Sequence, residues 1–321
     1  MNTFKWLLKR EYWEHRGGFQ WAPIITACVL TLMTVIGFVA AELAVGRIHF
    51  GTSRFNLNTI TANMTPDQLS SVGMGIDVFL YSMAAPIAIV LFFVLFFYLL
   101  GSLYDERRDR SILFWKSLPV SDLHTVLSKV VMATIVVPVI SVAVALLLML
   151  AVLLVMSVFV MFHGINPITT IWLTASPLSV AAKFLILLPV NALWALPTIG
   201  WLMLCSAFAK RAVFLWAVLV PVAAGFIVST ADVLQSFHIP DSAFWKYVVA
   251  RLLTSVMPGS WVDLSVFNGP RNFNGPADVM GLLGMDRIGQ VLSGPNLWIG
   301  VLAGVGMIAG AVWLRRWRDD S

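Results

Sequence analysis

The longest stretch of the sequence without Asp, Glu, Lys, Arg or His runs from Val130 to Phe162. A membrane-spanning helix needs about 20 apolar residues to cross about 30 Å of hydrocarbon, and at about 1.5 Å per residue this stretch reaches roughly 50 Å. It has no Gly and no turn dipeptide, and Pro138 alone kinks a helix rather than reversing it. We therefore expect one long helix that protrudes from a membrane, in preference to a hairpin of two shorter spans.

The composition extends this constraint to the whole chain. Hydrophobic residues make up 59% and charged residues 12% of its 321 residues, with a mean hydropathy of +0.87. Soluble domains carry about 45–50% apolar and about 25% charged residues, so a water-soluble fold is excluded, and the abundance of apolar residues also excludes a disordered chain. We predict an all-α, polytopic membrane protein with a single transmembrane domain over residues 1–321. Its six expected transmembrane helices are 21–43, 78–103, 126–162, 179–207, 212–231 and 296–314.

The basic residues indicate how these spans are oriented. With a single span at 126–162, 14 of the 21 Lys and Arg residues fall in short segments near span ends on one side. The positive-inside rule expects this distribution of cytoplasmic segments. A hairpin at 126–162 would move Lys210–Arg211 and the basic tail Arg315–Arg318 to the opposite side. We therefore expect six spans with both the N- and C-termini in the cytoplasm.

Two regions outside the spans have an amphipathic pattern. Residues 1–20 combine aromatic rings with Lys and Arg at helical spacing, which predicts a cytoplasmic helix lying in the membrane interface; a solvated basic tail that only sets topology is the alternative. On the outer side, 46–75 has the composition of a polar loop, and 232–295 forms a larger outer segment. Within it, 241–257 predicts an aromatic, amphipathic helix, either at the outer interface or partly inside the membrane. The Gly- and Pro-rich stretch that follows predicts a loop with one short helix.

No motif for catalysis, metal binding or nucleic-acid binding is found. The sequence has no phosphate-binding G-x-x-x-x-G-K-[ST] loop, no H-E-x-x-H and no G-x-S-x-G. The five histidines are scattered, and the two cysteines lie in apolar runs without the spacing of metal ligands. The net charge of +5 is divided among short loops rather than gathered on one basic face. We therefore expect no catalytic residue, no metal, no cofactor in this chain and no nucleic-acid partner; its expected surroundings are the lipid bilayer.

Polar residues within the expected spans are few, and Asn191 in the fourth span lies deepest. Ionisable residues inside a membrane are costly and usually functional, but Glu42, Asp77 and Lys183 fall near span ends, where we expect water and headgroups to reach them. An amide at the depth of Asn191 needs a hydrogen-bonding partner on another helix. Two interpretations stay open: Asn191 joins helices, or it faces a substrate pathway.

The connection between the second and third spans, 104–125, carries the most informative pattern. It opens with the charged run Asp105–Arg110 and continues with Ser111–Trp115, which is mostly apolar; Ser121 or Asp122 is then placed to cap the next helix. A short helix with charged flanks and an exposed apolar face suits docking into a groove of another protein. A helix that rests on lipid, with its tryptophan as an aromatic anchor, is the alternative, since both arrangements bury the same face.

This connection resembles the first cytoplasmic loop of the membrane subunits of ABC-2-type ABC transporters, chiefly exporters. That loop typically reads E-[RK]-x-x-G-[ST]-[IL]-x-x-[LWF]-x-x-[LS]-P-[VL]-[ST]. Arg110 departs from the pattern, because many members of the family have Gly there. The interfacial N-terminal helix, the six spans and the outer helices between spans five and six are also similar to the family. The matching residues are Glu106-Arg107, Ser111-Ile112, Trp115, Leu118-Pro119-Val120 and Ser121.

The resemblance implies a permease subunit of the bacterial cytoplasmic (inner) membrane that works by alternating access. In that family the loop forms a coupling helix on a separate ATPase subunit, two permeases pair, and the pathway lies between them. The implied partners are two ATPase copies, which bind ATP and Mg, and a second permease copy or a paralogue. A membrane scaffold or sensor that docks a cytoplasmic partner without transport is the alternative function. The implied ATPase-coupling residues are Glu106, Arg107 and Arg110 for polar contacts, Ile112, Leu113 and Trp115 for the groove, and Pro119 for the exit angle of the loop.

Overall fold

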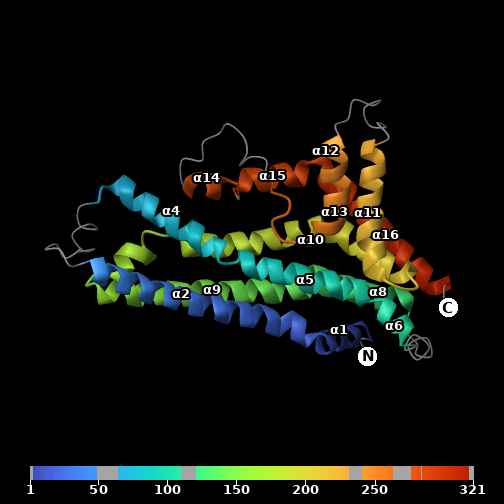
Figure 1. The fold of residues 1–321 in the computed structure, drawn as a ribbon, viewed down its shortest axis with the longest axis horizontal. Helices are drawn as coiled ribbons and strands as arrows, with labels where there is room; N and C mark the ends of the chain where they lie inside the picture. The colour runs from blue at the N-terminus through green and yellow to red at the C-terminus, as the bar shows by residue number, and fades with distance from the viewer. Residues whose placement is uncertain are drawn as a thin grey trace.

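The computed structural model contains only helices among the regular elements of its described residues (Figure 1). Six helical stretches are long and apolar enough to cross a membrane, which confirms the expected all-α, polytopic fold. The described ranges are 3–48, 64–109, 121–230, 241–262, 276–282 and 284–317. The elements, with η for a π-helical segment, are α1 (Thr3–Glu14), η1 (Gly17–Trp21), α2 (Ala22–Ile48), α4 (Pro66–Ser82), α5 (Ala85–Gly101), α6 (Tyr104–Arg108), α8 (Asp122–Val131), η2 (Met132–Val136), α9 (Val137–Phe162), η3 (Ile168–Trp172), α10 (Pro177–Phe208), α11 (Val213–Thr230), α12 (Asp241–Phe244), η5 (Trp245–Ala250), α13 (Arg251–Thr254), α14 (Pro276–Gly281), α15 (Met285–Ser293) and α16 (Pro295–Trp317).

The second long helical stretch begins earlier than the sequence predicts. Thr65 caps α4 by accepting the N–H of Gln68, and the Gln68 side chain accepts the N–H of Thr65 in return. This capping box satisfies N–H groups that have no partner inside the helix, and Pro66 follows in the first turn, where its missing N–H costs nothing. The predicted polar loop at 46–75 is therefore wrong from Pro66 onward.

The third long stretch is one continuous helix from Asp122 to Phe162, as the sequence predicts, and the hairpin alternative is excluded. It passes through the π-helical η2 just before Pro138. There the N–H of Val137 bonds to the carbonyl of Met132, five residues back. The wider turn precedes a proline whose ring has no N–H and crowds the turn before it, so the chain bends without reversing.

Most of the long helices lie along the length of the molecule. α2, the α4–α5 pair, α9 and α10 run in this direction, whereas α11, with α12, η5 and α13 beside it, is oriented across them at one end (Figure 1). α14 and α15 pack against α4 and α16 respectively. Both termini lie at the same end, together with α6 and the beginning of α8, the two helices that flank residues 110–120 (Figure 1).

α10 and α16 pack with their backbones in close contact. A Cβ atom added to Gly304 would lie 2.5 Å from the carbonyl carbon and oxygen of Leu196, and one added to Gly200 would lie 2.5 Å from the carbonyl oxygen of Gly304. Small residues at such crossings let helices approach where side chains would keep them apart. The glycines therefore fix the position of the C-terminal helix on α10.

The outer segment is more helical than predicted. The expected amphipathic helix is present as α12, η5 and α13, and its Trp245 packs against Gly225 of α11 and donates its indole N–H to Ser229 (3.0 Å). Beyond it the structure has two short helices, α14 and α15, where the sequence predicts one. The second is amphipathic and buries Ile288, a pattern that stands out only weakly among the surrounding glycines and prolines.

Asp77 is buried rather than reached by water, contrary to expectation. The residue is 7% exposed, and its carboxylate accepts the backbone N–H (2.9 Å) and the hydroxyl (2.5 Å) of Ser176, the residue directly before α10. A carboxylate at a helix N-terminus is stabilised by the unpaired N–H groups there. Asp77 thereby joins α4 to α10 at the end of the molecule opposite to the termini.

Candidate functional site

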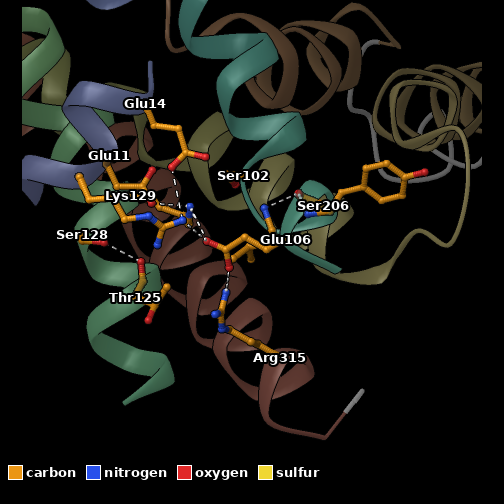
Figure 2. Close-up of polar contacts among 12 residues, drawn as sticks. Glu11, Glu14, Ser102, Glu106, Thr125, Ser128, Lys129, Ser206 and Arg315 are labelled. Carbon is orange, nitrogen blue, oxygen red and sulfur yellow. Dashed lines mark hydrogen bonds and ion pairs between the residues drawn. The ribbon is translucent and has the colours of Figure 1, made fainter. Parts of the chain in front are cut away.

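A buried charge cluster lies where the N-terminal helix, the C-terminal helix and the two helices flanking residues 110–120 meet. Figure 2 shows the carboxylate of Glu106 between the cations of Lys129 and Arg315, with Glu11 on the far side of Lys129. Four different helices, α1, α6, α8 and α16, supply these side chains. We define the charge cluster as Glu11, Glu106, Asp122, Lys129 and Arg315.

Glu106 is the centre of the charge cluster. Its Oε2 accepts from Nη1 of Arg315 at 2.6 Å, and its Oε1 lies 3.1 Å from Nζ of Lys129 and 3.9 Å from Nη2 of Arg10. The residue is only 7% exposed. An ionised carboxylate at such a depth requires cations and hydrogen bonds to replace its lost hydration, and both are present.

Lys129 and Arg315 each connect Glu106 to a second acid. Lys129 also donates to Oε1 of Glu11 at 2.8 Å, while Nε of Arg315 donates to Oδ1 of Asp122 at 3.0 Å. Oε2 of Glu11 accepts the hydroxyl of Tyr98 at 3.0 Å. The cluster therefore forms a chain of alternating charges in which every group has an opposite neighbour.

Local sequence explains why the helices present these groups to one another. The side chain of Ser121 caps α8 by accepting the N–H of His124, as predicted, so the third span begins at Asp122. Arg315 lies in the last turn of α16 and Glu106 in the first turn of α6. The helix dipole favours a cation at the C-terminus of a helix, so the last turn of α16 is a favourable position for the guanidinium of Arg315.

A second set of polar contacts fastens α6 to the end of α10. The fully buried hydroxyl of Ser206 accepts the N–H groups of Leu103 (3.0 Å) and Tyr104 (2.9 Å), where the chain turns from α5 into α6. Arg107 donates to the carbonyls of Ser206 and Ala209 (3.0 Å) at the C-terminus of α10. These bonds satisfy backbone groups that helix ends leave without partners and fix where α6 leaves the bundle.

The structure brings together some of the predicted coupling residues. Glu106 and Arg107 lie in the two polar sets described above, which join them to other helices of the same chain. The Glu106 carboxylate is enclosed by these contacts, and direct polar contacts of the two side chains with another protein stay a prediction. The remaining predicted residues, which lie outside the described part of the chain, are Arg110, Ile112, Leu113, Trp115 and Pro119.

Asn191 both joins parts of the fold and lines a cavity. Its Oδ1 accepts the indole N–H of Trp261 (3.0 Å) and the backbone N–H of Gly259 (3.3 Å), so it joins α10 to the turn segment that follows α13, where the sequence predicts a partner on another helix. It also lines an apolar cavity of about 500 Å³ between α5, α9 and α10. Its role in a substrate pathway stays a prediction.

Sequence reasoning missed the acids and cations that surround Glu106. Glu11 was counted as part of an interfacial helix, and Lys129 and Arg315 as topology-setting charges. Two signals point to them: Glu11 interrupts a strongly basic segment, and Lys129 directly precedes the uncharged stretch that begins at Val130.

Paired carboxylates and cations hold helices in position, and no group of three His, Cys, Asp or Glu within the described ranges is placed to hold a metal ion. Comparison of the chain with models of protein families, with curated proteins and with solved structures finds no match. The resemblance to ABC-2-type permeases therefore rests on the motif between Glu106 and Ser121.

Proposed function

We propose that this chain is the permease subunit of an ATP-driven, exporter-like transporter of the ABC-2 type. Two copies of a separate ATPase subunit would bind ATP and Mg, and a second permease copy or a paralogue would complete the pathway. In this proposal the complex lies in a bacterial cytoplasmic membrane, with both termini of the chain in the cytoplasm. The chain moves its substrate by alternating access and hydrolyses no ATP itself.

The observation that carries the proposal is the attachment of both flanks of residues 110–120 to the rest of the molecule. On one flank, Glu106 binds Arg315 of α16 and Arg107 binds the end of α10. On the other flank, Asp122 binds Arg315 and Lys129 binds Glu11 of α1. A force applied to this connection would therefore reach α1, α10 and α16 directly.

This arrangement gives the motif residues two different roles. Ile112, Leu113 and Trp115 supply the apolar face that fills a groove of the ATPase, and Glu106 and Arg107 act as positioning residues that transmit its displacement. Buried, paired charges suit such a role, because separating one ion pair leaves a buried charge without its partner, which is strongly unfavourable. Closure of the ATPase dimer on ATP would pull the flanking helices together as one unit.

The cavity beside Asn191 favours transport over the scaffold alternative. Ligand pockets typically enclose about 300–1,000 Å³ with mostly apolar walls and a few polar groups, and this cavity of about 500 Å³ falls in that range. A scaffold that only docks a partner requires no such space.

Purification from native membranes tests the proposal. The wild-type chain should co-purify with an ATPase subunit identified by mass spectrometry, and ATP hydrolysis should accompany it. Leu113→Asp with Trp115→Asp should remove the ATPase while the chain still inserts in the membrane, since a charged face cannot fill an apolar groove. Leu113→Met with Trp115→Phe keeps the face apolar and serves as the control. Absence of any ATPase from the wild-type preparation, or its normal recovery with the charged pair, contradicts the proposal.

A further inference from the structure

Two cavities adjoin each other on the side of α10 that faces the outer helices. The first, of about 500 Å³, lies between α5, α9, α10 and the segment that follows α13. The second, of about 460 Å³, lies between α10, α13, α15 and α16. Val262 and Leu282 line both cavities, so the two spaces share part of their walls.

The first cavity is apolar along most of its wall. Leu, Ile, Val and Ala side chains of α5, α9 and α10 form it, together with Phe184. A charged group without a partner is strongly disfavoured against such an apolar wall. Only a few of its lining residues carry polar side-chain groups: Tyr81, Ser82, Thr134, Ser141 and Asn191.

The second cavity has the opposite character. Lys246, Arg251 and Arg287 line it, with Gln290 and Asn296, and no Asp or Glu occurs among the described residues of its wall. Arg251 and Arg287 carry positive charge into the described part of this wall, and positive charge in a concave site raises the local concentration of anions. The two cavities therefore offer an apolar compartment and a cationic compartment side by side.

Arg251 is the most deeply placed cation of the second cavity. Its side chain donates to the carbonyls of Asn296 and Leu297, and its guanidinium carbon lies 4.1 Å from the ring centroid of Trp194. The residue is only 9% exposed, and its Nε is buried with no hydrogen-bond partner in the described structure. Burial lowers the pKa of this guanidinium, yet Arg stays protonated at neutral pH, so its charge is incompletely neutralised.

The surrounding backbone is shaped to accommodate Arg251. A Cβ atom added to Gly300 would lie 2.2 Å from Nη2 of Arg251, so only glycine leaves room for the guanidinium on α16. At the border of the two cavities, Trp261 lines the cationic cavity, and Asn191, its hydrogen-bond acceptor, lines the apolar one. Asn191 also accepts the backbone N–H of Gly259 there, so its amide holds both residues at this border.

We propose that the two cavities form one binding site for a single-chain amphipathic anion. Its apolar chain occupies the cavity between α5, α9 and α10, and its carboxylate or phosphate lies beside Arg251 and Arg287. The division of charge between the compartments carries this inference: a neutral lipid leaves the cationic compartment unmatched, and a small anion leaves the apolar one empty. Binding belongs to this chain alone and needs no ATPase.

Photo-crosslinking of the purified full-length chain in a non-ionic detergent tests the site. The probe is palmitate with a diazirine at the end of its chain, and its methyl ester is the matched neutral probe. Palmitate should label peptides of α5, α9 and α10 at the first cavity, whereas the ester should label them weakly. Lysophosphatidate should compete with palmitate for the site, and inorganic phosphate should not. The relative affinities of palmitate and lysophosphatidate then show whether the site prefers a carboxylate or a phosphate head group.

Substitutions at the two compartments sharpen the test. Arg251→Gln should weaken palmitate binding roughly tenfold, the effect expected of one lost charged hydrogen bond. Because Arg251 also binds α16, Leu282→Trp provides a second variant that narrows the junction and leaves every cation in place; Leu292→Trp on the same side of the molecule, outside both cavities, is its control. Gly300→Ala should displace Arg251 and weaken binding, unlike Gly306→Ala, where an added Cβ meets nothing within 4 Å.

Several outcomes overturn the proposal. Equal labelling by palmitate and its methyl ester would show that the negative charge of the ligand does not contribute to binding. Labelling confined to the lipid-facing surface of the helices shows that the cavity is not occupied. Unchanged binding in a folded Leu282→Trp variant shows that the ligand does not pass between the compartments. None of these results depends on whether an ATPase partner exists, so they are distinguishable from failure of the proposed transport function.

Discussion

The Nζ of Lys129 lies 2.8 Å from Oε1 of Glu11, and the two side chains are 3% and 2% exposed. Their positions are 118 residues apart in the sequence, so the contact ties the N-terminal helix to the helix that begins the third span. Lys129 also lies 3.1 Å from Glu106. One ammonium group therefore forms ion pairs with two buried carboxylates from two different helices.

Lys129→Met should destabilise the folded protein strongly. The substitution leaves Glu11 and Glu106 with one cation fewer in a buried position, and removing one partner of a buried ion pair costs about 3–5 kcal/mol. Thermal unfolding in detergent, followed by tryptophan fluorescence, measures the effect. Lys5→Met removes the same charge from an exposed position of α1 and should shift the unfolding temperature little. Similar shifts of the unfolding temperature in the two variants would show that the buried ion pairs stabilise the fold no more than the exposed charge of Lys5 does.

Glu106→Gln should separate docking from coupling. The amide keeps the shape of the side chain but loses the charge that holds Lys129 and Arg315, so an ATPase should still bind while its motion reaches α16 less effectively. Under the proposed function we expect substrate transport per ATP hydrolysed to fall roughly tenfold, the consequence of losing one charged interaction.

Reconstituted vesicles measure both rates in the same preparation. Glu14→Gln is the control, because Glu14 also pairs with Arg10 but is 53% exposed, and exposed pairs contribute little. Loss of the ATPase from the Glu106→Gln complex, instead of loss of transport, would assign this residue to docking.

Ser206→Ala should loosen the turn between α5 and α6. The N–H groups of Leu103 and Tyr104 lose their shared acceptor, and leaving a buried donor without a partner costs about 1–3 kcal/mol. Hydrogen exchange of the peptide that contains these amides should become faster than in the wild type. Ser70→Ala, which removes only a bond to Asp67 within an exposed helical turn, should leave that exchange unchanged. Equal exchange in both variants would mean that Ser206 does not hold the turn.

Much of the fold was predictable because its signals are local. Hydropathy alone locates the spans, and the uncharged stretch from Val130 predicts a single long helix that the structure confirms. The cap at Ser121 follows from the same kind of reasoning. The early start at Pro66 was missed because its residues are polar, although the capping residues Thr65 and Gln68 stand in the sequence. Hydropathy identifies the apolar part of a helix, but it does not show how far the helix extends into polar residues.

The charge cluster was predictable only in part, for a different reason. A local motif singles out Glu106, but its partner Arg315 is 209 residues away. Which basic residue meets which acid depends on how the helices pack, and a topology rule assigns Lys129 and Arg315 only to a side of the membrane. The burial of Glu106 has the same origin, since a charge at the border of a loop cannot be recognised as buried before the packing of the helices is known.

Gly304→Val should disrupt the junction of α10 and α16 far more than Gly306→Val does. An added Cβ at Gly304 would lie 2.5 Å from the backbone of Leu196, whereas at Gly306 it would meet nothing within 4 Å. Both substitutions change helix propensity equally, so the difference in unfolding temperature between them isolates packing; overfilling a close contact typically costs about 1–3 kcal/mol. Because Arg315 lies on the same helix, displacement of α16 should also weaken its contact with Glu106. A Gly304→Val variant as stable as Gly306→Val would mean that the two helices do not pack through their backbones.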